Sequence, residues 1–264
     1  MPDSVVFDRA AGYYDDTRGF PPGEEIPAAA MLARAGKLHT DSRLLEIGVG
    51  TGRVAIPLTA HVNTIVGVDL SVPMLQVLCG KASAGHIHAI HGDITRLPLP
   101  TAHFDAVLAV HIFHLVPGWQ TALDEVARVL RPGGVLLNAW NEYHARNPED
   151  EHLPEIYRAA IGSYPANVGV RHEHRDTFLD NTGWQPVGEP HAHNFTQIRT
   201  AGRFVELAEN RIWSSSWRLT EAAHMRGMAA VRAAVAEDNI DLDRPMLYDA
   251  SFNVKVYTKP IEKS

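Results

Sequence analysis

Residues 44–53 read Leu44-Leu45-Glu46-Ile47-Gly48-Val49-Gly50-Thr51-Gly52-Arg53, and this stretch decides the fold. It begins as a buried strand, continues through three glycines at alternate positions, and ends where a helical pattern begins. Glycine permits a tight turn and removes side chains that keep a ligand away from the backbone. The free N–H groups at a helix start favour an electron-rich or anionic group. The stretch therefore predicts a ligand-binding loop between a strand and a helix.

The spacing of these glycines separates two classes of nucleotide-binding loop. A dinucleotide fingerprint that starts at Gly48 needs its third glycine at position 53, which is Arg53. The glycines instead occupy positions 48, 50 and 52, with the acidic Glu46 ahead of them. The spacing opposes a nicotinamide-dependent oxidoreductase.

Short β-rich runs alternate with helical patterns around this loop. Most of the strand candidates are apolar without alternation, which is typical of strands buried on both faces. The strand candidates are Arg43–Ile47, Thr64–Asp69, Ile87–His91, Phe104–Val110 and Val135–Trp140. The helix candidates between them are Arg53–Ala60, Pro73–Ala82 and Thr121–Leu130, the last ended by the breakers Arg131-Pro132-Gly133-Gly134. This repetition predicts an α/β fold with a doubly wound, mostly parallel sheet.

The flanking regions are expected to complete a single domain over residues 1–264. Residues 1–40 are interpreted as an N-terminal cover or lid, and residues 41–140 as the cofactor-binding core. Residues 141–250 are predicted to be a helical cover with a strand near 192–199, and residues 251–264 the last strand and a tail. No internal repeat or low-complexity linker divides the chain.

Composition excludes several classes of protein. The net charge of −7 provides no general basic surface for nucleic acid. The single cysteine, Cys79, cannot form an internal disulfide, and its apolar neighbours predict a small buried side chain. No apolar run approaches the roughly 20 residues of a membrane span, and no apolar stretch follows Met1 as in a signal peptide. We expect a cytoplasmic protein with no membrane span.

Further motifs follow the glycine loop in a fixed order. They are Gly67-Val68-Asp69-Leu70-Ser71 with Met74-Leu75, His91-Gly92-Asp93-Ile94, Phe104-Asp105-Ala106-Val107, His111-Ile112-Phe113-His114-Leu115 and Leu130–Leu136. Over roughly residues 40–140 the sequence resembles the class I S-adenosylmethionine-dependent methyltransferases, whose first motif is acidic-x-Gly-x-Gly-x-Gly. It is similar to the broad group that contains quinone-ring and small-metabolite enzymes. The resemblance implies a seven-stranded Rossmann-like sheet.

The resemblance also implies S-adenosylmethionine as cofactor and S-adenosylhomocysteine as product. Gly48 and Gly50 are expected against the methionine part of the cofactor, with Glu46 orienting the loop. Asp69 is suited to the two ribose hydroxyls and Asp93 to the adenine amine. The complete expected set is Glu46, Gly48, Gly50, Gly52, Asp69, Leu70, Met74, Asp93, Ile94, Val110, Tyr14 and Arg18. The alternatives are a turn or helix cap at each aspartate and core packing for Met74.

His111 and His114 are the candidate bases for methyl transfer. They follow the fourth strand candidate, at the carboxyl edge where open α/β sheets bind ligands, and histidine titrates near neutral pH. The alternative is that one orients a loop and the other fills space. No close pair of histidines with a carboxylate supports a metal site.

The sequence thus predicts transfer of a methyl group to a small-molecule acceptor, because a large cover encloses the acceptor pocket. Tyr14 and Arg18 of the N-terminal segment are expected to reach the methionine carboxylate or the substrate; the alternative is a fixed surface helix. Three alternative functions stay open: an RNA methyltransferase, a non-catalytic S-adenosylmethionine-binding protein and an NAD-dependent oxidoreductase.

Overall fold

The computed structural model describes residues 4–81, 86–174 and 177–259, and its contacts divide the chain into two compact units. The sheet unit comprises residues 1–141, 168–193 and 252–264, and the helical unit comprises residues 142–167 and 194–251. The sequence had predicted one domain with a continuous cover over 141–250. The division arises because 168–193 contacts the sheet unit, whereas the segments on either side of it have a hydrophobic core of their own.

The sheet confirms the α/β class and the mostly parallel arrangement. Its strands are β1 (Arg43–Ile47), β2 (Thr64–Asp69), β3 (Ile87–His91), β4 (Phe104–Val110), β5 (Leu130–Ala145), β6 (Gln185–Pro186), β7 (His191–Thr200) and β8 (Pro245–Thr258). The order is β3-β2-β1-β4-β5-β8-β6, with β7 paired to β8. The described residues therefore form eight strands rather than seven, and the shortest is β6, which pairs antiparallel with β8.

The central strands have the predicted bounds because each is an apolar run between breakers. β1 pairs in parallel with both β2 and β4, so Leu45 lies between Val66 and Val107. From β1 the sheet extends through β2 to β3 on one side and through β4 to β5 on the other. Folds of this type bind ligands in the crevice at the carboxyl ends of the two strands where the order reverses, which here are β1 and β4. β5 begins earlier than predicted because Leu130 already pairs with Phe104 of β4, and residues 131–134 form an irregularity before the pairing resumes at Val135.

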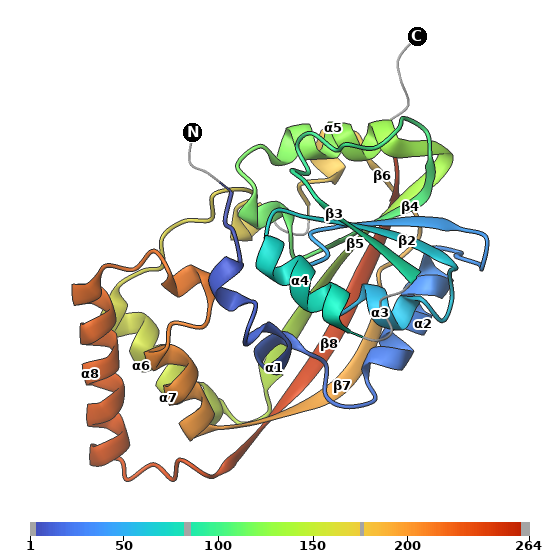
Figure 1. The fold of residues 1–264 in the computed structure, drawn as a ribbon. Coiled ribbons are helices and arrows are strands. Elements are labelled where there is room, and N and C mark those ends of the chain that lie inside the picture. The colour runs from blue at the N-terminus through green and yellow to red at the C-terminus, as the bar shows by residue number, and fades with distance from the viewer. Residues whose placement is uncertain (1–3, 82–85, 175–176, 260–264) are drawn as a thin grey trace. The chain divides into compact units, whose positions relative to one another are not determined.

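Helices cover both faces of the sheet unit. They are α1 (Tyr14–Arg18), α2 (Glu25–Ala35), α3 (Ala55–Leu58), α4 (Val72–Gly80) and α5 (Trp119–Val129). α5 lies on one face and α2, α3 and α4 on the other (Figure 1). The buried stripe of α5, which includes Leu123 and Val126, packs with Leu45 and Ile47 of β1. Ala82, the last residue of one predicted helix, lies outside the described residues.

Cys79 is exposed on α4, so the prediction of a buried thiol was wrong. The apolar run that contains it is wound into a helix that turns Met74, Leu75 and Leu78 inward. Cys79 therefore faces outward although its sequence neighbours are apolar.

The helical unit contains α6 (His152–Ile161), α7 (Ala201–Glu209) and α8 (Glu221–Glu237), all within the stretch 141–250 that was predicted to contain a helical cover. Gly227 of α8 permits close packing on α6, because a β-carbon there would lie 2.6 Å from a ring carbon of Tyr157. The short 3₁₀ helices within the described residues are η1 (Asp8–Ala10), η3 (Phe113–Leu115), η4 (Pro148–Glu151), η5 (His172–His174), η6 (Asp180–Thr182) and η7 (Ser214–Ser216). Among the described residues, no helix combines the length and apolarity needed to cross a bilayer.

Candidate active site

The glycine loop after β1 adopts a backbone conformation that other residues rarely take. Gly48, Gly50 and Gly52 have φ values of 71°, 54° and 77°. This left-handed region costs an L-residue roughly 1–2 kcal/mol, which explains why glycine occupies these positions. The loop therefore turns tightly above β1 and leaves backbone exposed to the crevice.

Asp69, at the end of β2, holds the glycine loop in place. Its Oδ2 accepts a hydrogen bond from Gly50 N–H, and its Oδ1 accepts one from Ser71 N–H, both at 2.8 Å. Burial raises the pKa of Asp69, and these backbone donors oppose the shift. The turn that was the alternative reading of Asp69 is present, yet each carboxylate oxygen keeps acceptor capacity for a further donor.

A cavity of about 60 Å³ opens between the glycine loop, β2, β4 and the N-terminal segment. The residues of the expected cofactor-binding set that line it are Tyr14, Gly48, Gly50, Asp69, Leu70, Met74, Ile94 and Val110, and the candidate base His111 lines it as well. Sequence reasoning missed the other lining residues, which are Ser4, Val5, Val6, Phe7, Ile112, Leu115 and Val116. The short apolar run Val5-Val6-Phe7 is the sequence signal that could have identified this part of the wall.

Glu46 and Gly52 support the loop without lining this cavity. Glu46 is 2% exposed, and burial raises its pKa to about 8, with Arg53 opposing the shift and Asp69 adding to it. Its Oε2 has no hydrogen-bond partner among the described residues. A β-carbon at Gly52 would lie 2.4 Å from Leu78 Cδ1, so this glycine permits close packing of the loop on α4.

Asp93, Arg18 and His114 also do not line the cavity. Asp93 is exposed, and its Oδ1 accepts hydrogen bonds from the N–H and Oγ1 of Thr95, both at 2.8 Å. This is the turn that was the alternative for Asp93. The cavity wall contains the next residue, Ile94.

His111 has an unusual conformation and an occupied ring nitrogen. Its φ is 50°, and its Nε2 accepts a hydrogen bond from Asn141 N–H at 2.8 Å. Burial, together with the charge of Arg53, lowers its pKa to about 3. The ring is therefore neutral at ordinary pH. The shorter contact, from Asn141 N–H, favours the tautomer with its proton on Nδ1, while Asn141 Oδ1 lies 3.3 Å from the same Nε2. The ring of His114 lies 6.5 Å away and perpendicular to it.

The N-terminal segment, residues 4–18, is hydrogen-bonded to the loop and to the start of α4. Asp8 accepts from Ser71 Oγ at 2.7 Å, and Asp15 accepts from Thr51 Oγ1 at 2.6 Å. Lys81 pairs with Asp15 at 2.9 Å and donates to the Thr51 carbonyl. These contacts explain how a segment outside the sheet closes the cavity.

Comparison with known proteins relates this site to a family. Residues 45–138 match the methyltransferase domain family. An uncharacterized methyltransferase of Mycobacterium bovis is 37% identical over 157 residues, which cover 58% of this chain and 59% of that protein. A fatty-acid O-methyltransferase of Mycolicibacterium smegmatis is 40% identical over 97 residues, 36% of this chain and 35% of that one. The matches thus span less than two thirds of either relative.

A solved structure extends the likeness of fold to nearly the whole chain. It is a phosphoethanolamine N-methyltransferase of Haemonchus contortus in complex with phosphomonomethylethanolamine and S-adenosylhomocysteine. At 20% identity and a TM-score of 0.52, the alignment covers 96% of this chain and 58% of that chain.

Proposed function

Because residues 45–138 belong to the methyltransferase domain family, we propose that this chain transfers the methyl group of S-adenosylmethionine to a small-molecule acceptor. The observation that carries the proposal is Asp69, a half-buried carboxylate in the cavity wall that accepts a hydrogen bond from the Gly50 amide at 2.8 Å. This acidic group at a strand end, beside a backbone free of side chains, suits an adenosyl ligand. The sulfonium of the bound cofactor supplies an activated methyl group for in-line displacement.

The residues around the cavity fit the parts of this cofactor. Asp69 accepts from the ribose hydroxyls, while Leu70 and Met74 offer apolar surface to the base. The Gly48 and Gly50 backbone permits close approach of the methionine part. Glu46 lies beneath the loop, and its neutral carboxyl has one oxygen without a hydrogen-bond partner among the described residues. We propose that this carboxyl orients the loop and that a positive charge nearby lowers its pKa.

The cavity is smaller than the cofactor requires, so the proposed function needs part of its wall to move. Pockets for ligands of this size usually measure about 300–1,000 Å³, several times the 60 Å³ of this cavity. Ser4–Phe7 supply part of its wall, and Val5 N–H donates to the Leu115 carbonyl at 3.0 Å. We therefore propose that residues 4–18 are a lid, which moves aside for the cofactor and closes again to exclude water.

His111 is proposed to orient the acceptor by donating from Nδ1–H rather than to act as a base. A group with a pKa of about 3 and its other nitrogen occupied has little basicity at neutral pH. Such a site favours an acceptor that is already ionised, such as a carboxylate, because it needs no proton removed. The similarity to a fatty-acid O-methyltransferase supports this acceptor class. A role for His114 as a base stays a prediction.

The test combines binding and turnover. Calorimetry should give saturable binding of S-adenosylmethionine and S-adenosylhomocysteine and no binding of NAD. Mass spectrometry of a panel of carboxylic acids, alcohols and amines should then find methyl esters first. Preference for NAD would support the oxidoreductase, and cofactor binding without turnover on any acceptor would support a non-catalytic binding protein.

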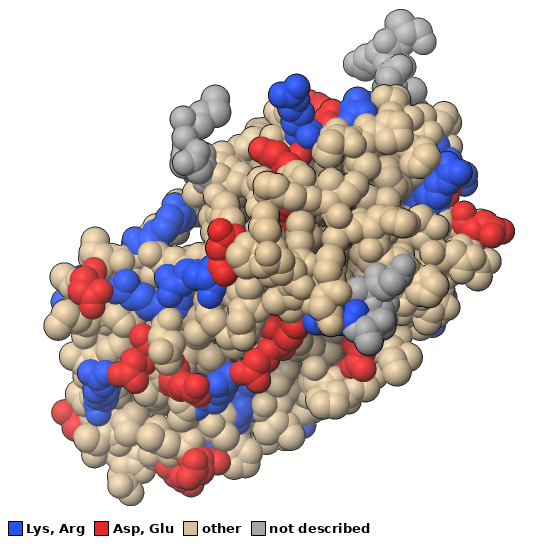
Figure 2. Space-filling model, viewed as in Figure 1, with Lys and Arg blue, Asp and Glu red and all other residues tan. Residues whose placement is uncertain are grey.

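An RNA acceptor is the less favoured alternative. The net charge is −7, and basic and acidic side chains are interspersed on the face shown in Figure 2. Strong RNA binding usually needs clustered positive charge. Methyl transfer to total RNA that exceeds transfer to every small acid would overturn the choice of acceptor class.

A further inference from the structure

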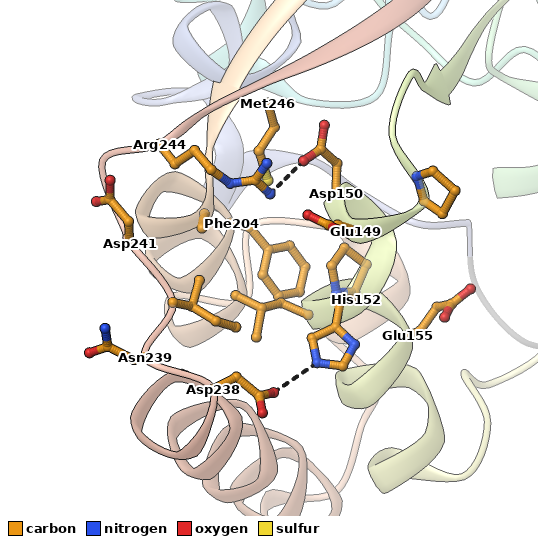
Figure 3. A pocket seen from close by; sticks show the side chains of 15 residues that line it. Glu149, Asp150, His152, Glu155, Phe204, Asp238, Asn239, Asp241, Arg244 and Met246 are labelled. Atoms are coloured by element: carbon orange, nitrogen blue, oxygen red, sulfur yellow. Dashed lines mark hydrogen bonds and ion pairs between the residues drawn. The ribbon is translucent and has the colours of Figure 1, made fainter.

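A second and much larger cavity lies entirely within the helical unit. Its volume is about 650 Å³, which is within the usual range for small-molecule sites. It is bounded by η4 and the start of α6 on one side and by α7 and the segment that joins α8 to β8 on the other (Figure 3). None of its lining residues belongs to the sheet unit, which contains the glycine loop.

The polar part of the lining is strongly acidic. Its carboxylates are Glu149, Asp150, Glu155, Asp238 and Asp241. The only basic groups in the lining are Arg244 and His152. Even with His152 protonated, five carboxylates face two positive charges and leave an excess of three negative charges. This excess selects against anions and favours a cation.

Asp150 is the lining residue whose surroundings indicate a ligand. Its side chain is fully buried, and its Oδ1 pairs with Arg244 at 2.7 Å, while its Oδ2 has no partner among the described residues. A buried charged oxygen without a donor is costly, so native structures rarely retain one unless it has a use. The Arg244 side chain is 38% exposed, so solvent reaches the Arg244 side of the ion pair that covers the carboxylate.

The remaining wall is apolar and suits the body of an organic molecule. Leu153, Phe204 and Met246 line it, and the Phe204 ring lies between the Arg244–Asp150 pair and the His152–Asp238 pair (Figure 3). An aromatic ring beside carboxylates accommodates a molecule with one charged end and one apolar end.

We propose that this cavity binds a small organic amine with an apolar body. Its ammonium N–H donates to the Asp150 carboxylate, and its apolar part packs against Phe204. The surplus carboxylates balance its charge. The proposal is independent of the methyltransferase function, because the cavity shares no residue with the cofactor site.

The experiment compares two probes of the same shape on the full chain. Calorimetry with 2-phenylethylamine should give saturable binding at least about tenfold tighter than with the neutral 2-phenylethanol, because only the amine supplies a charged donor. Equal affinity for the two probes, or no saturable binding of the amine, would overturn the proposal.

Substitutions then assign the contact. Asp150→Asn should weaken amine binding by about tenfold or more, whereas Asp124→Asn, which removes an exposed carboxylate of α5 outside the lining, should leave it unchanged. If Asp150→Asn fails to fold, the double variant Glu149→Gln/Asp241→Asn decides, because both residues are exposed. It should weaken binding about two- to fivefold. Unchanged affinity in a folded Asp150→Asn protein, or in the double variant, refutes the site.

Discussion

Replacing Gly50 by valine separates ligand exclusion from simple destabilisation. The φ of 54° imposes a strain of roughly 1–2 kcal/mol on any L-residue, and a β-branched one is at the upper end. The nearest obstacle to a β-carbon is Met74 Cε at 3.1 Å, the flexible end of a side chain. The expected loss of stability is therefore about 2 kcal/mol, which a domain with the usual 5–15 kcal/mol tolerates.

Gly188→Val is the matched control. Its φ is 70°, and no heavy atom lies within 4 Å of a β-carbon built there, so it carries the same backbone strain away from the cavity. Both variants should lose similar stability in urea unfolding. Only Gly50→Val should lose cofactor affinity, by at least about a hundredfold or ~2.7 kcal/mol, because its side chain occupies the backbone approach. A folded Gly50→Val protein that binds S-adenosylhomocysteine with unchanged affinity in calorimetry would refute the assignment.

Three further predictions concern the same site. Asp69→Ala should weaken cofactor binding about ten- to a hundredfold, and a 2′-deoxy cofactor should lose less affinity in this variant than in the wild type; an equal loss in both proteins contradicts the ribose contact. The folded pKa of Glu46 is about 8 against an ordinary 4.5, so the folded state holds an extra proton between these values and stability falls as pH rises through this window, by at most about 1.4 kcal/mol per pH unit. In urea unfolding, the free energy of unfolding should fall less steeply between pH 5.5 and 7.5 in Glu46→Gln than in the wild type. Identical slopes in the two proteins would count against the buried neutral carboxyl. Hydrogen exchange of residues 5–18 should be fast without cofactor and slow with S-adenosylhomocysteine, and equal protection in both states would rule out the lid.

The sequence predicted the strands that are determined by local pattern. The predicted bounds of β1 to β4 agree with the structure because each strand is a mainly apolar run that ends at strand-breaking residues. The glycine loop could also be predicted, because its glycines occupy the three positions at which the backbone is left-handed. The start of β5 was mispredicted for the opposite reason. Arg131-Pro132-Gly133-Gly134 has the local chemistry of a turn and forms an irregularity within the strand, because Leu130 and Val135 on either side of it both pair with β4.

Features that depend on contacts between residues far apart in the chain could not be predicted from the sequence. The division into two units rests on contacts such as the one between Tyr157 and His224, whose side-chain atoms lie 3.0 Å apart across 67 positions. The low pKa of His111 depends on its burial, and its tautomer depends on the backbone of Asn141, 30 residues later. Its type and place after β4 made it a candidate base, whereas its surroundings support our proposal that it acts as a donor.

The exposed thiol of Cys79 makes the lid hypothesis open to direct observation. It is the single cysteine of the chain, so a maleimide fluorophore attaches at one position without any engineered substitution. α4, which carries it, is capped at its N-terminus by Ser71, whose hydroxyl donates to Asp8 of the N-terminal segment. A dye at this position therefore sits on the helix that the segment touches. If the segment is the lid that we propose, the emission, followed in a stopped-flow instrument after mixing with cofactor, should change at the rate of its opening and closing.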